Sequence, residues 1–186
     1  GKIPHNEWEA HFYSLAIKIS GAVQASRWTD LPEGGFICSF NGPHSLFVDT
    51  IRSCRILVAS HLMGHSLHGE GDRKISLLER ALQHIEATAK YSIYYGEGRD
   101  HYDIWGRTAH EIIFNTNDGQ FRCPNAQQGY TGFSTWTRGL AWGMLGFAEE
   151  LEALELVNSD ELTALGGFDK IEEMMLKGAK ATCDFY

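Results

Sequence analysis

The sequence has few cysteines and no long apolar run, and both shortages exclude classes of protein. Its 186 residues include four cysteines, Cys38, Cys54, Cys123 and Cys183, and no two of them form a C-x-x-C pair. This spacing is not a zinc pattern and gives no obvious disulfide framework in a chain of this length. We therefore expect free thiols, mostly buried. No apolar stretch approaches the roughly 20 residues that span a bilayer, so no membrane partner is predicted.

Positive charge is also scarce. The chain has 16 Lys and Arg against 24 Asp and Glu, which gives a formal net charge of -8. Nucleic acid is a poor partner for such a chain, because phosphate binding needs a basic surface. An anionic ligand would have to be bound by a local cationic group. The sequence also has no G-x-S-x-G, P-loop or G-x-G-x-x-G motif, so serine hydrolase and nucleotide-binding functions have no support.

What the sequence does contain is helical periodicity. Apolar residues recur at helical spacing over roughly residues 6–27, at Trp8, Phe12, Leu15, Ile19 and Val23. The segment from Leu46 to Leu62 is apolar on most sides, which predicts a largely buried helix. Further helices are expected over roughly 75–89, 134–156 and from 168 onward. Strands do not alternate with helices and have no regular spacing, so α/β and all-β folds fit poorly.

A long irregular segment separates the central helices. It runs from Gly96 to Gly132, with Asn117-Asp118-Gly119 as a clear turn. Loops of this length in a compact domain are usually functional. We therefore predict an all-α protein, a helical toroid or part of one, with functional loops between its helices.

Arg138 and Trp142 form one candidate binding pair. They lie four residues apart and share one face near the start of a predicted helix. The guanidinium could bind a carboxylate with two hydrogen bonds, and the indole could stack on a sugar. The alternative interpretation is a core Trp142 beside an exposed or ion-paired Arg138.

Asp49 is the candidate for acid–base chemistry, because it lies in an apolar segment near a helix start. Burial would raise the pKa of its carboxyl toward that of a general acid, whereas the helix N-terminus would lower it. The sequence does not decide between a catalytic group and an ordinary helix-start Asp.

Three histidines, His61, His65 and His68, have a spacing that can bind metal. No Glu accompanies them in the zinc-protease arrangement, and a solvated helix end is favoured. We predict no metal site.

Several segments together resemble one enzyme family. Gln128–Tyr130 followed by Ser134–Trp142 resembles the Q-G-[YF]…S-x-W-x-R-G-Q-A-W signature of unsaturated glucuronyl hydrolases, glycoside hydrolase family 88. Upstream, Gly34–Ile37, Phe47–Ile51 and Thr108–His110 resemble further segments of that family, in the same order. The W-x-R-G-x-A-W part is the most specific.

The resemblance implies an (α/α)6 barrel, of which we expect this chain to cover about the middle half as one incomplete helical domain, residues 1–186. It implies a bacterial enzyme that binds an oligosaccharide ending in a 4,5-unsaturated uronic acid. Such enzymes hydrate the C4=C5 double bond, and the resulting hemiketal rearranges to release the sugar. They use no metal or organic cofactor.

The resemblance also assigns residue roles. Asp49 matches the general acid and base, and the residues that match the uronate pocket are His110, Gln128, Trp136, Arg138 and Trp142. The family's second important Asp would fall before Gly1. Two departures, Gly132-Phe133 in place of acidic residues and Leu140 in place of Gln, leave the exact decoration of the substrate open.

Three other functions stay open. One is the related unsaturated rhamnogalacturonyl hydrolase, which has the same barrel and chemistry; the R-G-x-A-W motif modestly favours the glucuronyl family. The second is a non-catalytic sugar-binding helical protein, and the third is a structural helical domain whose matched residues are core. The sequence does not give the oligomeric state, or whether the compartment is bacterial cytoplasm or periplasm.

Overall fold

The computed structural model describes residues 5–186, of which about half are helical. The α-helices are α1 (Glu7–Ser26), α2 (Cys54–Leu62), α3 (Leu77–Ala87), α4 (Thr137–Leu154), α5 (Ser159–Ala164) and α6 (Phe168–Phe185). The short helical turns are η1 (Val48–Ser53), η2 (Glu70–Asp72) and the π-helical η3 (Thr88–Ser92). The strands are β1 (Trp28–Asp30), β2 (Gly35–Ile37), β3 (Ser45–Phe47), β4 (Leu67–His68), β5 (Lys74–Ile75), β6 (Glu111–Phe114) and β7 (Phe121–Asn125). No helix in this described range is long and apolar enough to cross a membrane.

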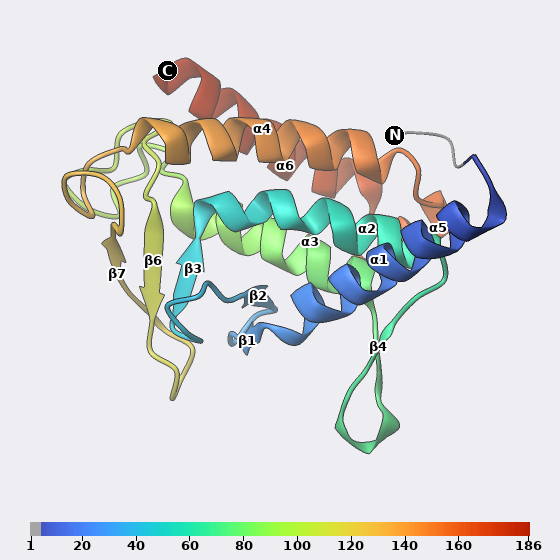
Figure 1. Cartoon of the computed structure of the whole chain (residues 1–186). Helices are drawn as coiled ribbons and strands as arrows, with labels where there is room; N and C mark the ends of the chain where they lie inside the picture. Colours follow the sequence, from blue (N-terminus) through green and yellow to red (C-terminus); the bar gives the residue numbers. More distant parts are fainter. Residues whose placement is uncertain (1–4) are drawn as a thin grey trace.

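The helices form two layers (Figure 1). Helices α4 and α6 lie side by side over α2 and α3, and α1 lies at the edge against α2. Buried apolar side chains from all four packed helices fill the space between the layers, among them Leu57, Leu78, Ile85, Phe147 and Met175. The antiparallel sheet β3-β6-β7 closes one end of these layers. The predicted all-helical class is confirmed, with small sheets only at its margins.

Two expectations about local structure were wrong, and for the same reason. The expected helix from Leu46 to Leu62 begins as strand β3 and turn η1, and α2 starts only at Cys54. The irregular segment contains the β6–β7 hairpin, although its predicted Asn117-Asp118-Gly119 turn is present. Leu46 lies opposite Ile112, far along the chain, and both are fully buried. Non-local pairing of this kind overrides local periodicity.

The cysteines are free thiols, as expected, but most are not buried. Cys54 lies in the core, whereas Cys123 and Cys183 are exposed and Cys38 is intermediate. The wrong expectation came from treating cysteine as a small core residue. Cys123 lies on β7, at the edge of its sheet, where one face is open to solvent.

Helix α1 faces solvent with its apolar side. The predicted helix is present, and the Asn6 side chain caps it by accepting a hydrogen bond from the Glu9 N–H. Its buried residues are small, Gly21 and Ala25, and Gly21 packs closely on Ser60 of α2. The large apolar side chains are between 41% and 73% exposed: Trp8, Phe12, Leu15, Ile19 and Val23. We call these five residues the α1 stripe.

The α1 stripe leads to a prediction about association. Contiguous exposed apolar surface drives association or dye binding. We therefore expect the isolated 186-residue chain to self-associate in sedimentation experiments, or to bind a hydrophobic dye. Replacing Phe12 and Ile19 together by serine should weaken both effects, whereas Lys18→Ser on the same helix should not. A clean monomer with sharp cooperative unfolding and no dye binding would contradict this prediction and the proposal of an incomplete domain.

Candidate active site

A glycine face on α4 determines where Asp49 lies. Gly139, Gly143 and Gly146 recur at spacings of four and three, which puts them on one side of the helix. A Cβ at Gly139 would lie 3.4 Å from the Val48 side chain, and one at Gly146 would overlap Ile51. The missing side chains allow η1 to pack tightly on α4. This packing places Asp49, the second residue of η1, near the N-terminus of α4.

Backbone pairing brings Asp49 to His110. His110 directly precedes β6, and its carbonyl accepts a hydrogen bond of 3.0 Å from the Val48 N–H. The His110 Nε2 lies 3.8 Å from the Asp49 Oδ1 atom, too far for a direct hydrogen bond but close enough for a charge interaction. The Asp49 side chain is 37% exposed, while its Oδ1 atom is buried and has no hydrogen-bond partner among the described residues.

Burial decides the protonation of both groups. It raises the pKa of Asp49, against the opposing effects of a backbone hydrogen bond and of His110. It also lowers the pKa of His110, against the opposing charge of Asp49. A neutral imidazole therefore lies beside a carboxyl that retains its proton to higher pH than usual. Of the two effects on Asp49 that the sequence left open, burial is the larger.

His110 lies between two aromatic rings, and its tautomer is fixed. Its ring centroid is 4.8 Å from that of Phe47 and 4.6 Å from that of Trp136. The backbone N–H of Gln128 donates to its Nδ1 atom over 3.2 Å. Because Nδ1 accepts this bond, the neutral ring carries its proton on Nε2, on the side of Asp49. Gln128 thus contacts His110 through its backbone, and its side chain is exposed.

Arg138 lies at the entrance to this cluster. Its guanidinium is exposed and lies 5.7 Å from the centroid of the Trp136 ring. Trp136 occupies the N-cap position of α4, and no side chain caps that helix end. Arg138 is the second residue of α4, so a guanidinium and the positive end of the helix dipole belong to the same first turn, a combination that favours a carboxylate.

Trp142 lies one turn further along α4. The Arg52 guanidinium lies 4.5 Å from the centroid of its ring, and Arg52 pairs with Glu149 over 3.1 Å. Arg52 thus covers one face of this indole. The structure brings Asp49, His110, Trp136 and the backbone of Gln128 together, with Arg138 beside them and Trp142 at the margin.

Sequence reasoning missed two contributors to this site. Phe47 was assigned to a buried helix, and only strand pairing brings its ring against His110. Glu111 was not identified from the sequence, yet it is fully buried directly after His110. A charged residue directly after a candidate site histidine is the one sequence feature that could have drawn attention to it.

One of the three histidines, His61, joins two helices. His61 lies 2.7 Å from Glu161 and so joins α2 to α5. Among the side chains that the structure describes, no three His, Cys, Asp or Glu residues are grouped to bind a metal ion.

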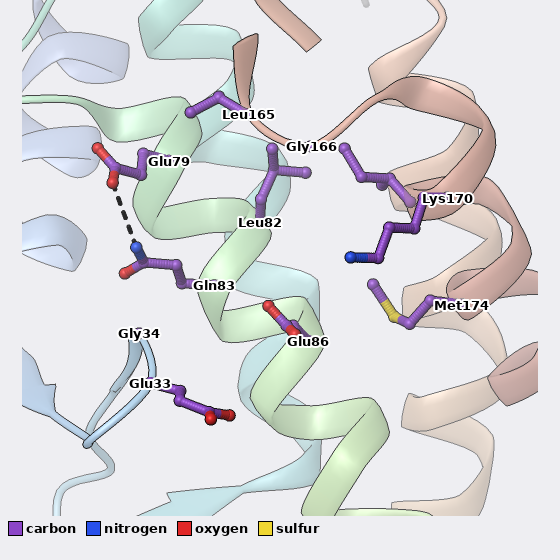
Figure 2. A pocket seen from close by; sticks show the side chains of 11 residues that line it. Glu33, Gly34, Glu79, Leu82, Gln83, Glu86, Leu165, Gly166, Lys170 and Met174 are labelled. Atoms are coloured by element: carbon purple, nitrogen blue, oxygen red, sulfur yellow. Dashed lines mark hydrogen bonds between the residues drawn. The ribbon is translucent and has the colours of Figure 1, made fainter. Parts of the chain in front are cut away.

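A hollow of about 320 Å³ lies away from these residues, between α3 and the α5–α6 region (Figure 2). Its apolar lining includes Leu82 and Met174, and Glu79, Glu86 and Lys170 lie at its edge. None of the predicted site residues lines it. It therefore offers no support for the predicted chemistry.

Neither the family models nor the curated proteins include a match to this chain, but solved structures do match it. Unsaturated glucuronyl hydrolase from Bacillus sp. GL1, described as responsible for the degradation of glycosaminoglycan, matches with a TM-score of 0.60 and 21% identity, over 95% of this chain and 40% of its own. An unsaturated glucuronyl hydrolase specific for heparin gives a TM-score of 0.65 at 16% identity, over 94% and 38%. A UGL variant with the saccharide dGlcA-Glc-Rha-Glc gives 0.61 at 22%, over 94% and 40%.

These likenesses show the fold. The chain has the architecture of part of an α/α barrel, as predicted, and spans about two-fifths of the length of these structures. Identities this low do not transfer an activity, since one fold supports many functions.

The contact between η1 and α4 gives a prediction with a built-in control. Gly146→Ala should destabilise the protein by about 1–3 kcal/mol, because the new methyl group overlaps Ile51. Gly143→Ala should be neutral or stabilising by up to about 1 kcal/mol, since its methyl would meet Val48 at an ordinary 3.5 Å and alanine favours a helix. Thermal unfolding of both variants measures the difference. Equal stability of the two would show that the packing of η1 does not depend on the absence of a side chain at Gly146.

Proposed function

We propose that this chain carries the active site of a glycoside hydrolase that removes a terminal 4,5-unsaturated uronic acid by hydrating its C4=C5 double bond. The observation that carries the proposal is Asp49, a half-buried carboxyl with a raised pKa that lies beside a neutral, buried His110. A group that donates a proton near neutral pH needs such a raised pKa. The fold of the solved glucuronyl hydrolases supports the same class of enzyme.

In the proposed reaction, one carboxyl transfers two protons in turn. The protonated Asp49 donates its proton to C4 of the double bond, and a water molecule adds to C5. The Asp49 carboxylate takes the proton that this water loses, so the net change is the addition of one water molecule. The resulting hemiketal at C5 then opens and rearranges to release the neighbouring sugar. His110, with its Nε2–H directed to Asp49, orients that carboxyl or the water.

The uronate carboxylate binds at the N-terminus of α4 in this proposal. Arg138 supplies a planar pair of N–H donors, and the uncapped helix end adds partial positive charge. The exposed side chain of Gln128 provides hydrogen-bonding groups for the sugar hydroxyls, and the rings of Trp136 and Trp142 form its walls. A local cationic site of this kind is what an anionic substrate requires in a protein of net charge -8.

Asp49→Asn tests the proposed proton donor. The amide retains the shape but does not exchange the proton, so turnover of an unsaturated glucuronyl disaccharide by the full-length protein should fall at least about 100-fold. Loss of the ultraviolet absorbance of the double bond measures the rate, and Asp169→Asn, at an exposed position of α6, is the control. In the wild type, the rate should fall as the pH rises through the raised pKa of Asp49. A variant with more than about a tenth of the wild-type rate would rule out this role.

Arg138→Lys tests the carboxylate contact. Lysine retains the charge but lacks the planar fork, so KM should rise about tenfold or more while the protein remains folded. Lys18→Arg, on the remote helix α1, is the matched control. Unchanged KM and kcat would remove Arg138 from the substrate site. Binding of the disaccharide without turnover, even in the wild type, would favour a non-catalytic sugar-binding protein instead.

A further inference from the structure

Glu111 is a buried carboxylate that accepts hydrogen bonds from side chains of two segments, residues 41–45 and 125–127. It is the first residue of β6 and is fully buried. Its Oε1 atom accepts hydrogen bonds from Ser45 Oγ and from Asn41 Nδ2, the latter over 2.9 Å. Its Oε2 atom accepts from Asn125 Nδ2 over 2.7 Å and from Gln127 Nε2 over 3.4 Å. A carboxylate that makes four such bonds can be buried without a cationic partner.

As the structure arranges this network, only donors face position 111. Every partner donates: three are amide NH2 groups, and Ser45 receives a hydrogen bond from Ser39 and passes its own proton to Glu111. An ionised carboxylate has only acceptors, so it satisfies all four donors at once. A glutamine of the same shape would direct an NH2 group at one of these donors, so the network would have to rearrange, with a partner amide rotated, to restore that bond.

The network continues directly into the candidate active site. Asn125 lies opposite Glu111 in the β6–β7 ladder, so their side chains meet across the strands. The chain then passes through Gln127 to Gln128, whose backbone N–H donates to His110 Nδ1. His110 is also the residue immediately before Glu111. The carboxylate therefore fixes both ends of the Gln128–His110 hydrogen bond.

We propose that Glu111 is a positioning residue that selects the Nε2–H tautomer of His110 by fixing the segment from Asn125 to Gln128. Without it, this segment moves and the Gln128 N–H no longer occupies Nδ1. The imidazole can then carry its proton on Nδ1 and present an unprotonated Nε2 to Asp49. The consequence for catalysis rests on the proposed function, whereas the tautomer itself does not.

The test reads the tautomer directly, in the full-length protein labelled with ¹⁵N-histidine and without substrate. We expect His110, assigned by comparison with His110→Gln, to show an acceptor-type Nδ1 and a protonated Nε2 in the wild type. In Glu111→Gln both ¹⁵N signals should move toward averaged values. Glu86→Gln, an exposed change on α3, should leave them unchanged. Unaltered His110 signals in a folded Glu111→Gln protein would overturn the proposal.

A second, compensating substitution distinguishes a positioning role of Glu111 from a general loss of stability. Adding Asn125→Asp to Glu111→Gln exchanges donor and acceptor across the ladder, so the double variant should recover the wild-type tautomer. If Glu111→Gln does not fold, Asn125→Ala removes one donor and should shift the tautomer less; no shift there would also overturn the proposal.

Kinetics then distinguish the two proposals. Glu111→Gln should lower kcat about 10-fold to 100-fold with little change in KM, as for groups that orient a catalytic residue. If Glu111→Gln shifts the tautomer but the wild-type protein shows no turnover, only the proposed function is wrong. If Glu111→Gln keeps the wild-type tautomer while the wild-type protein turns over the substrate normally, only the proposed role of Glu111 is wrong.

Discussion

Close contact between η1 and the glycine face of α4 is the constraint on which the candidate site depends. The absence of a side chain at Gly146 lets Ile51 approach the helix, and Val48 packs beside Gly139 and Gly143. Asp49, between these two residues, is thereby placed at the N-terminus of α4. The same helix end presents Trp136 and Arg138, so one packing contact assembles the acid and the cationic group.

Burial then sets the direction in which the pKa values of His110 and Asp49 shift. His110 is enclosed by Phe47 and Trp136, which stabilises its neutral form and leaves it poised beside Asp49. Asp49 is only partly enclosed, so a ligand can reach a carboxyl whose pKa is nevertheless raised. This pairing of a carboxyl with an imidazole differs from the two carboxylates that flank the anomeric carbon in most glycosidases. It suits the addition of water to a double bond, in which one carboxyl can supply and recover the proton.

The helices were predictable, since the periodicity at Phe12 and Ile19 identifies α1, and the segments around α3, α4 and α6 follow similar patterns. The strands were not, because Leu46 and Ile112 acquire their structure from each other across a separation that no local pattern encodes. The same limit applied at the site. Motif resemblance indicated Asp49 and Arg138, but the partners of Glu111 lie on two segments distant in sequence, which only the folded chain brings together.

The central claim is that the double bond, and not the glycosidic bond, is the first to be attacked. Rapid-mixing kinetics on an unsaturated glucuronyl disaccharide with a chromogenic leaving group can follow both events in one reaction of the full-length protein. The account predicts that absorbance of the double bond is lost before, or together with, release of the leaving group. Release of the leaving group ahead of the loss of the double bond would contradict it, because the enzyme would then cleave the glycosidic bond directly.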